Sequence, residues 1–396
     1  MRFFRDLSLS TVTAGFVAML VGFTSSIAIV FSAARALGAN DAQVSSWVWA
    51  ISMGTGGLTL ALSLWYRLPV MVAWSTPGAA VLATAAASGG FTLPEAVGAF
   101  LICGAAITIA GFSGLFERVM TRIPLALAGA LLAGVLSRFA LDGVLATRSE
   151  PLLVMAMLAA YLAGRRWFAR YTMVLVLAVG ITIAAVTGSL ESGAIQWSLA
   201  RPVFLSPQFS LAAIVSLALP LFVVTMAGQN LPGVAVIRTF DYPVPISKVI
   251  GVTGLGSLLL APFGGYALNL SAITAAICMG PAAHEDRDRR YTAAASNGVL
   301  YLAVGMGGAA VTSLLNAFPV ELVRAVAALA LLSTIAANLS AAVTLETNRD
   351  AAILTFLVTL SGVTLGGVGS AFWGAIAGVV ALVAQRWRSG AAQSTG

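Results

Sequence analysis

Apolar stretches bounded by glycine, proline or charged residues follow one another along nearly the whole chain. The first seven cover about residues 10–34, 43–65, 69–88, 93–115, 123–142, 151–164 and 172–188. The second seven cover about residues 208–227, 245–261, 263–280, 293–315, 318–342, 349–362 and 369–385. A straight spanning helix needs roughly 20 apolar residues, so the pattern predicts an all-α polytopic membrane protein with about 14 spans, or alternatively about 12 or 13.

Composition indicates the same class of protein. Of the 396 residues, 59% are hydrophobic and 9% are charged, and the mean hydropathy is +0.97. A soluble domain carries about 25% charged residues, so the surplus apolar side chains are expected to face a lipid bilayer. The net charge of +7 does not indicate nucleic acid, because the basic residues lie in short runs between apolar stretches. Cys103 and Cys278 lack metal or disulfide spacing, and no cofactor or metal is expected.

The positions of the basic residues predict how the spans are oriented. If the N-terminus is cytoplasmic, five of the 21 lysines and arginines fall on the outer side, namely Arg35, Arg138, Arg148, Arg201 and Arg324. The other 16 fall on the inner side. Since cytoplasmic loops of membrane proteins carry an excess of Lys and Arg, we expect both termini to be cytoplasmic.

The two sets of seven stretches indicate an internal repeat. Arg122-Ile123-Pro124 opens the fifth stretch and Ala317-Phe318-Pro319 opens the twelfth, an offset of 195 positions that also relates Thr76 to Ser271. Seven is an odd number of spans, so the second half would enter the membrane upside down. We therefore expect two inverted repeats, residues 1–188 and 208–388, which is a recurrent transporter architecture.

The third stretch is predicted to be half extended and half helical. Residues 69–74 are rich in valine and suit an extended segment. Ser75, Thr76 and Pro77 then give a helix start, with a hydroxyl at the N-cap and proline in the first turn. A helix from there to about Ala87 would cross roughly half a bilayer.

The tenth stretch repeats this plan. Residues 264–268 suit an extended segment, Asn269 or Leu270-Ser271 would cap a helix, and Gly280-Pro281 would end it. Non-helical backbone at membrane depth is tolerated only where protein or water surrounds it, so we expect both spans to be broken. The alternative for Gly264 and Gly265 is that they only allow close helix packing.

In the predicted topology, both half-helices begin near the centre of the bilayer. A helix N-terminus carries about half a positive charge and several unpaired N–H donors. Two such ends facing each other predict a binding site for an anion.

Three segments carry a resemblance to a known family: WSTPGAA at 74–80, TMAGQNLPGVAVIR at 225–238 and PFGGYALNLSAITAAICMG at 262–280. In these segments, and over nearly the whole chain, the sequence resembles the BenE family of benzoate/proton symporters. More remotely it resembles uracil/proton symporters and sulfate permeases, which share a fold of two inverted seven-span repeats. The resemblance implies a core domain of about residues 10–115 and 208–315, which moves against a gate domain of about residues 123–188 and 318–385.

The resemblance also implies a substrate site between the third and tenth spans, faced by the first and eighth. Carried onto this sequence, it points to Ser75, Thr76, Pro77, Gln229, Asn230, Tyr266, Asn269, Leu270 and Ser271. Phe23, Thr24, Ser25 and Ser26 on the first span are looser candidates. The cap hydroxyls and N–H groups would bind a carboxylate, while aromatic and apolar side chains would enclose its ring.

The sequence departs from the wider fold in one respect. Uracil symporters have a glutamate on the eighth span, where this chain has Gln229 and Asn230. The absence of that carboxylate suits an anionic ligand, but it also removes the obvious proton carrier. Acids such as Glu95, Asp142, Glu321 and Glu346 fall near span ends, so proton coupling is implied by the resemblance alone. For Gln229 and Asn230, the alternative interpretation is a polar helix end at the cytoplasmic surface.

These observations predict a secondary transporter of the bacterial inner membrane that imports benzoate or a related aromatic carboxylate with protons, in which homodimers are possible. An enzyme is not expected, because no histidine or acid falls in the middle of a span and GxSxG and HExxH are absent. His284 falls in a polar loop. The alternatives are a nucleobase or inorganic-anion carrier of the same fold, and a passive anion channel.

Overall fold

The computed structural model describes residues 2–120, 125–167, 172–190, 198–281, 283–344, 346–363, 365 and 370–393. Arg122 to Pro124, on which part of the predicted repeat depends, lie outside the described residues. The described chain is predominantly helical, with one short two-stranded sheet.

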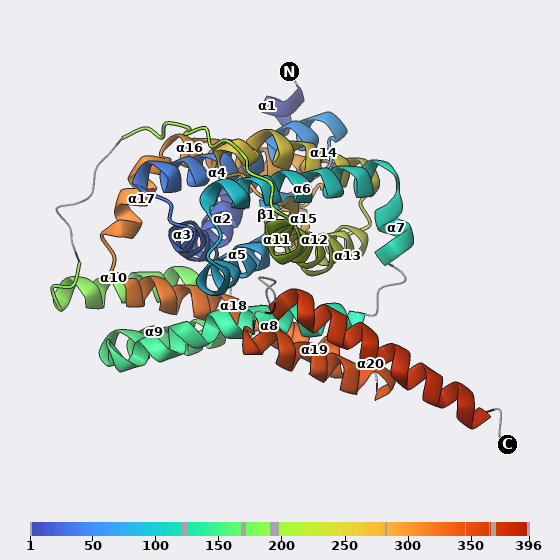
Figure 1. Cartoon of the computed structure of the whole chain (residues 1–396). Coiled ribbons are helices and arrows are strands. Elements are labelled where there is room, and N and C mark those ends of the chain that lie inside the picture. The colour runs from blue at the N-terminus through green and yellow to red at the C-terminus, as the bar shows by residue number, and fades with distance from the viewer. Residues whose placement is uncertain are drawn as a thin grey trace.

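The helices form two layers, which Figure 1 shows one above the other. The upper layer contains α1 (Arg2–Asp6), α2 (Leu9–Thr24), α3 (Ile27–Ala36), α4 (Asp41–Tyr66), α5 (Thr76–Gly89), α6 (Leu93–Phe112), α11 (Leu211–Ala213), α12 (Leu219–Thr225), α13 (Leu231–Thr239), α14 (Ile246–Leu260), α15 (Ile273–Met279), α16 (Tyr291–Met306) and α17 (Gly308–Asn316). The lower layer contains α8 (Leu125–Leu145), α9 (Pro151–Trp167), α10 (Thr172–Val186), α18 (Val320–Thr344), α19 (Arg349–Ser361) and α20 (Ser370–Gln393).

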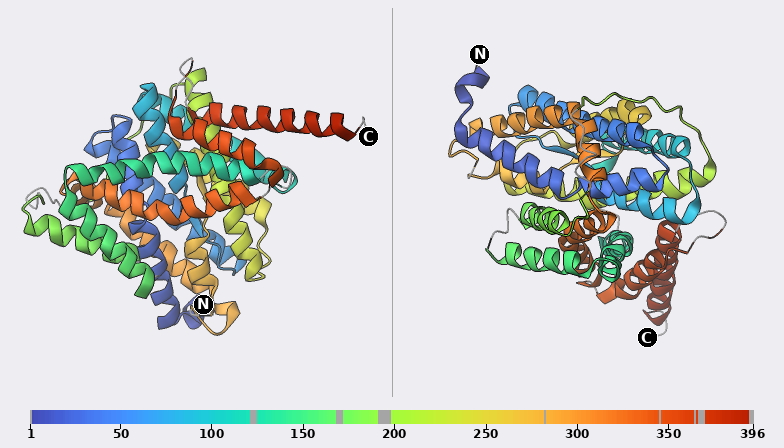
Figure 2. Two further views of the ribbon diagram at one scale, coloured as in Figure 1. Left: turned by 90° about the horizontal axis from the view of Figure 1, so that it is seen from below. Right: turned by 90° about the vertical axis from the view of Figure 1, so that its left-hand side faces the viewer.

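Each layer joins segments from both halves of the sequence. On the right of Figure 1, α7 (Leu115–Met120) leads from the upper layer towards the lower one, and on the left α17 does the same for the second half. The side view in Figure 2 shows the lower layer as a separate group of helices beneath the upper one. The two halves of the chain are therefore interleaved in space rather than placed side by side.

Glycines allow the helices of the upper layer to approach closely. A methyl group on Gly56 of α4 would lie 2.6 Å from the carbonyl oxygen of Gly298 in α16, and one on Gly298 would lie 2.8 Å from that of Gly56. A methyl group on Gly111 of α6 would lie 2.1 Å from the backbone nitrogen of Gly251 in α14. Close backbone approach over small residues is typical of helix association in membranes, where no hydrophobic force drives helices together.

Among the described residues, seven helices are long and apolar enough to cross a membrane. An eighth would be the bent pair Arg287–Met306 and Gly308–Asn316, whose axes meet at 66°. Shorter apolar helices occur at Thr76–Ala87, Thr172–Val186 and Phe372–Gln385. These helices establish a predominantly helical membrane protein, as the sequence predicts.

The first apolar stretch differs from the single helix expected over residues 10–34. It is divided at Ser25 and Ser26 into α2 and α3. The hydroxyls of both serines donate to the carbonyl oxygen of Gly22, at 3.1 and 2.8 Å. Such side-chain bonds compete with the helical backbone pattern, and here they coincide with the break.

The sheet consists of β1 (Val72–Trp74) and β2 (Leu268–Leu270), which pair antiparallel with Ala73 opposite Asn269. Backbone N–H groups at its two outer edges donate hydrogen bonds to side chains of the surrounding helices. Thr59 accepts the N–H of Val72 at 3.0 Å, and Ser257 accepts that of Leu268 at 2.8 Å. A buried two-stranded ladder would otherwise leave N–H groups without partners, which is costly away from water.

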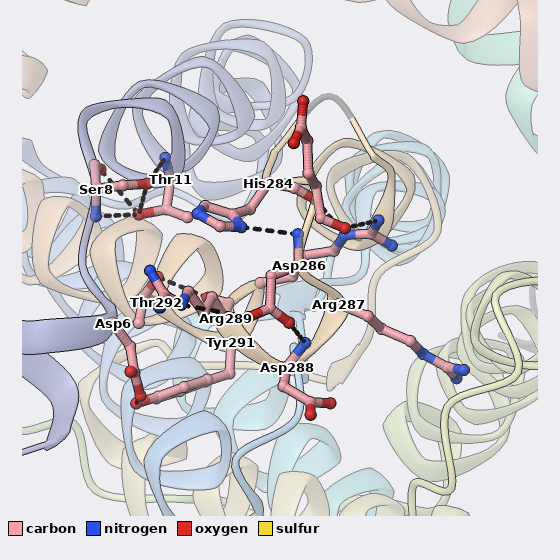
Figure 3. A network of polar contacts seen from close by, with 12 residues as sticks. Asp6, Ser8, Thr11, His284, Asp286, Arg287, Asp288, Arg289, Tyr291 and Thr292 are labelled. Atoms are coloured by element: carbon pink, nitrogen blue, oxygen red, sulfur yellow. Dashed lines mark hydrogen bonds and ion pairs between the residues drawn. The ribbon is translucent and has the colours of Figure 1, made fainter.

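A polar network joins several chain segments at one end of the upper layer (Figure 3). The Tyr291 hydroxyl donates to Asp6 at 2.8 Å, which ties α16 to the N-terminal segment. Arg290 donates to the carbonyl oxygen of Met279 at 2.9 Å, at the C-terminal end of α15. His284 accepts the N–H of Asp286 at 2.9 Å and lies in the loop before α16, as expected. The basic loop thus holds the end of α15 in place.

Candidate functional site

The N-terminus of α5 is built from the Ser-Thr-Pro sequence. Ser75 is the N-cap, with its hydroxyl accepting the N–H of Gly78 at 3.1 Å, and proline follows in the first turn. The Thr225 hydroxyl of α12 donates to the same Ser75 oxygen at 2.8 Å, and both residues are fully buried. The start of α5 is therefore fixed both by its own cap and by the neighbouring helix.

The segment after β2 differs from the predicted cap at Asn269 or Ser271. Helix α15 begins at Ile273, after Ala272, and the N-cap position makes no side-chain hydrogen bond. The backbone N–H of Ser271 instead donates to the carbonyl oxygen of Met71 at 3.0 Å and prolongs the ladder. Thr274 donates to the Ser271 hydroxyl at 2.6 Å, so two hydroxyls mark this helix start.

A π-helical turn at Met226–Asn230 separates α12 from α13. Such turns are rare and occur mostly as single-turn insertions in α-helices, often at functional sites. Here the turn presents Gln229 and Asn230 to different surroundings. Asn230 is fully buried and accepts the N–H of Leu270 at 2.9 Å, which joins this turn to β2.

These elements surround a cavity of about 320 Å³, which we call the central cavity. It is lined by Gly22, Ser25, Ser26, Val72, Ala73, Trp74, Thr76, Pro77, Gly228, Gln229, Pro232, Ser271, Ala272, Ile273, Thr274, Tyr301, Ala330, Leu331, Ala337 and Asn338. The last four belong to α18 of the lower layer, and the others belong to the upper layer. The central cavity therefore lies where the two layers meet.

One side of the central cavity is aromatic. The rings of Trp74 and Tyr301 meet edge to face with centroids 5.6 Å apart, and Phe23 packs behind them at 6.2 and 6.5 Å. The indole N–H of Trp74 is buried and has no hydrogen-bond partner among the described residues. An unpaired buried donor of this kind is costly.

The structure brings together six of the residues predicted for the site. Ser25, Ser26, Thr76, Pro77, Gln229 and Ser271 all line the central cavity. They come from four segments that are distant in the sequence but meet at the two strand–helix junctions. That they contact a substrate stays a prediction.

The other predicted site residues lie behind the lining. Ser75, Asn230 and Leu270 form the supporting bonds described above, and Phe23 backs the aromatic side. Asn269 is buried, and its amide nitrogen donates to the carbonyl oxygen of Ala267 at 2.9 Å. Tyr266 is buried between the rings of Trp47 and Phe100, 5.9 and 5.6 Å away. Their positions favour support of the site over contact with a ligand.

Sequence reasoning did not select four polar or aromatic residues of the lining: Trp74, Thr274, Tyr301 and Asn338. Trp74 belongs to the WSTPGAA segment and could have been chosen from it. Asn338 could not have been chosen from the sequence. Its segment was assigned to the gate domain, and a polar residue there had no evident partner. Its place on α18 is visible only once the layers are assembled.

None of the described residues that line the central cavity is charged. The acids expected near span ends lie away from the middle of the helices. Glu95 belongs to the capping box of α6, and Glu321 accepts a hydrogen bond from Ser149 at 3.1 Å. Glu346 lies 3.7 Å from Arg349 in an exposed ion pair, and Asp142 is exposed. Chemically, the cavity offers neutral donors beside aromatic rings.

Gly264 and Gly265 do not line the central cavity. Gly264 has φ of +92°, and a methyl group there would lie 1.8 Å from Trp47. A methyl group on Gly265 would lie 2.5 Å from Leu260. The packing alternative for these two glycines therefore fits the structure better than close approach to a ligand.

Comparison with known proteins gives the family. The family model described as "Benzoate membrane transport protein" (BenE) matches residues 5–384. The inner membrane protein YdcO of Escherichia coli (strain K12) is 46% identical over 94% of this chain and 95% of its own length. The benzoate membrane transport protein of Acinetobacter baylyi (strain ATCC 33305 / BD413 / ADP1) is 38% identical over 95% of each chain.

Solved structures of remote sequence show the same fold. The transmembrane domain of a cyanobacterial bicarbonate transporter, BicA, superposes with a TM-score of 0.62 at 14% identity, covering 95% of this chain and 98% of that one. SLC26A9 superposes with a TM-score of 0.59 at 12% identity, covering 94% of this chain and 65% of that one. The family match and the two relatives cover nearly the whole chain, and the protein is therefore a member of the BenE family of benzoate membrane transport proteins.

Proposed function

We propose that this protein is a secondary active transporter that imports benzoate or a related aromatic carboxylate across the bacterial inner membrane by proton symport. The observation that carries the proposal is the central cavity, in which neutral hydrogen-bond donors face aromatic rings. Its volume of about 320 Å³ suits a small ligand, and apolar walls with a few placed polar groups are typical of ligand sites. The Acinetobacter relative, named for benzoate transport, supports the choice of substrate.

In the proposed complex, the carboxylate lies at the strand–helix junctions. The hydroxyls of Ser271 and Thr274, the amide of Gln229 and the first turn of α5 supply donors and positive potential without a full charge. The ring lies against Trp74 and Tyr301, whose edge-to-face contact leaves an apolar wall. Because α15 has only seven residues, its hydroxyl pair contributes more than its dipole.

The proposed topology has about 14 spans in two inverted repeats, residues 1–188 and 208–388, with both termini cytoplasmic. Spans 3 and 10 are the broken ones, and they correspond to β1 with α5 and to β2 with α15. Two contacts support this topology. Each joins two segment ends that the topology puts on the same side of the membrane. Tyr291 bonds Asp6 at the proposed inner end, and Arg35 bonds Asn316 at 2.8 Å at the proposed outer end.

Alternating access would move the core, residues 10–115 and 208–315, against the gate, residues 123–188 and 318–385. This division follows the two layers of helices seen in Figure 1. The central cavity supports such a motion, because α18 is the one gate-side helix that lines it among the described residues. Sliding α18 past the strand–helix junctions would expose the ligand to one side and then to the other.

Uptake of labelled benzoate into proteoliposomes tests the proposal. With acid outside and neutral pH inside, the protein should accumulate benzoate above its outside concentration and saturate with substrate. Without the pH gradient, benzoate should only equilibrate. Flux that neither saturates nor accumulates would indicate a passive anion channel instead. Competition by uracil or bicarbonate, but not by aromatic acids, would indicate the carrier alternatives.

A further inference from the structure

The structure has a further cavity, separate from the central one, whose lining combines arginines with aromatic rings. It has a volume of about 470 Å³ and lies between α3, α17 and α18, at the proposed outer end; we call it the outer cavity. Its polar and aromatic lining consists of Phe31, Ser32, Arg35, Asn316, Phe318 and Arg324. The central cavity, by contrast, has no charged residue among the described part of its lining.

The two arginines of the outer cavity differ in how their charges are balanced. Arg35 forms an ion pair with Asp41 and donates to Ala39 and Asn316, at 2.9 and 2.8 Å. Arg324 is exposed, and within the described residues it forms no ion pair or side-chain hydrogen bond. Glu321, one turn earlier on α18, accepts from Ser149. Arg324 is therefore the cation available to an anion.

One aromatic ring of the outer cavity, that of Phe31, is positioned by Arg35. The guanidinium of Arg35 lies over the ring of Phe31, 5.2 Å from its centroid, and this cation–π contact positions the ring. Asp41, whose charge would repel an anion, lines a different cavity and not this one. A carboxylate on Arg324 and a ring near Phe31 and Phe318 would match the chemistry of the surroundings.

A third, apolar cavity adjoins the outer cavity and reaches the ring of Phe23 behind the central cavity. It has a volume of about 220 Å³ and shares Leu315, Phe318 and Val323 with the outer cavity. Its lining also includes Phe23, whose ring contacts Trp74 and Tyr301 of the central cavity. The three cavities thus form a row between α18 and the upper layer.

We propose that the outer cavity is a capture site, where an aromatic carboxylate binds Arg324 before it passes the apolar cavity to the central one. This inference rests on the proposed function and extends it. An uncompensated cation at the entrance attracts anions and raises the rate of encounter. The described lining of the apolar cavity has no charged residue to hold an anion, so the ligand would pass it only when the layers move apart.

The test compares Arg324→Gln with Arg148→Gln, which removes an exposed arginine from the same proposed side and from outside these cavities. In right-side-out vesicles, Arg324→Gln should raise the KM for benzoate about two- to fivefold at low salt and leave kcat unchanged. The increase should shrink at high salt, because salt screens exposed charges. Arg324→Lys should keep most of the wild-type KM, and uptake by inside-out vesicles should not change.

Three outcomes would overturn the capture site. If wild-type protein accumulates benzoate but Arg324→Gln behaves like Arg148→Gln, the inference fails while the proposed function stands. If wild-type protein accumulates no aromatic carboxylate, the proposed function fails and the capture site with it. An anionic lipid headgroup could also bind Arg324, so the assay is repeated in proteoliposomes of purely zwitterionic lipid. Loss of the difference between the variants there would assign Arg324 to lipid.

Discussion

At the scale of single residues, Gln229 and Asn230 show how neighbours in the chain can take different tasks. The π-helical turn that contains them places Gln229 on the central cavity and buries Asn230 against β2. The sequence left open whether this pair forms a site or a polar helix end. In the structure Gln229 lines the cavity and Asn230 supports β2, and contact of Gln229 with a substrate stays a prediction.

Replacement of Gln229 should therefore affect binding rather than folding. A hydrogen bond to a charged group is worth about 1.5–3 kcal/mol, so Gln229→Ala should weaken benzoate binding roughly ten- to a hundredfold. Isothermal titration of the purified protein measures the affinity, and a thermal melt measures stability. Asn230→Ala is the contrasting variant: it leaves the buried N–H of Leu270 unpaired and should lower the melting temperature. Unchanged affinity in Gln229→Ala would remove this side chain from the site.

Gly264 offers a second residue-scale prediction, which concerns stability. Its φ of +92° and its contact with Trp47 leave no room for a side chain. Gly264→Ala should lower the melting temperature and the yield of folded protein, because both the backbone conformation and the space disfavour it. The control is Gly57→Ala in α4, where no atom lies within 4 Å of the added methyl group. That variant should be neutral or slightly more stable, since alanine favours helix more than glycine. A Gly264→Ala protein as stable as Gly57→Ala would contradict the observed backbone.

At the scale of elements, the N-cap of α5 connects local structure with the site. Ser75→Ala removes the cap of Gly78 and the partner of Thr225, and a lost N-cap costs about 0.5–2 kcal/mol. We expect lower stability and also weaker benzoate binding, because the first turn of α5 lines the central cavity. The matched variant is Thr92→Ala at the capping box of α6, which lies away from that cavity. It should lose similar stability but bind benzoate normally, and equal affinities in the two variants would argue against α5 as part of the site.

The elements also show what the sequence could predict and what it could not. Apolar length predicted a predominantly helical membrane protein, and the Ser-Thr-Pro signal predicted the start of α5, because both depend on residues close in the chain. The break at Ser25 and Ser26 was missed, since hydroxyl bonds to Gly22 leave no mark in hydropathy. The cap of α15 was placed too early, because the N–H of Ser271 pairs with Met71 across the sheet. That pairing depends on a partner about 200 residues away in the sequence, beyond the reach of local signals.

At the scale of the whole molecule, the proposed inverted topology makes a prediction that single cysteines can test. Cysteines at Arg166 and Arg287 should react with an impermeant thiol reagent only from the cytoplasmic side. A cysteine at Leu199, an exposed position, should react only from outside. The native cysteines, Cys103 and Cys278, are buried and should contribute little background. Reaction of the Arg166 and Arg287 positions from opposite sides would contradict the inverted repeat, because an odd number of spans would then separate them.

The uncharged lining of the central cavity has a consequence for the energetics of transport. If benzoate crossed alone, the loaded carrier would move one negative charge against an interior-negative voltage, at a cost of about 2.3 kcal/mol per 100 mV. If a proton crosses with it, the loaded carrier and the empty carrier are both neutral within this cavity. Import would then be electroneutral and would carry no current, so the voltage that drives many other carriers would neither help nor hinder it.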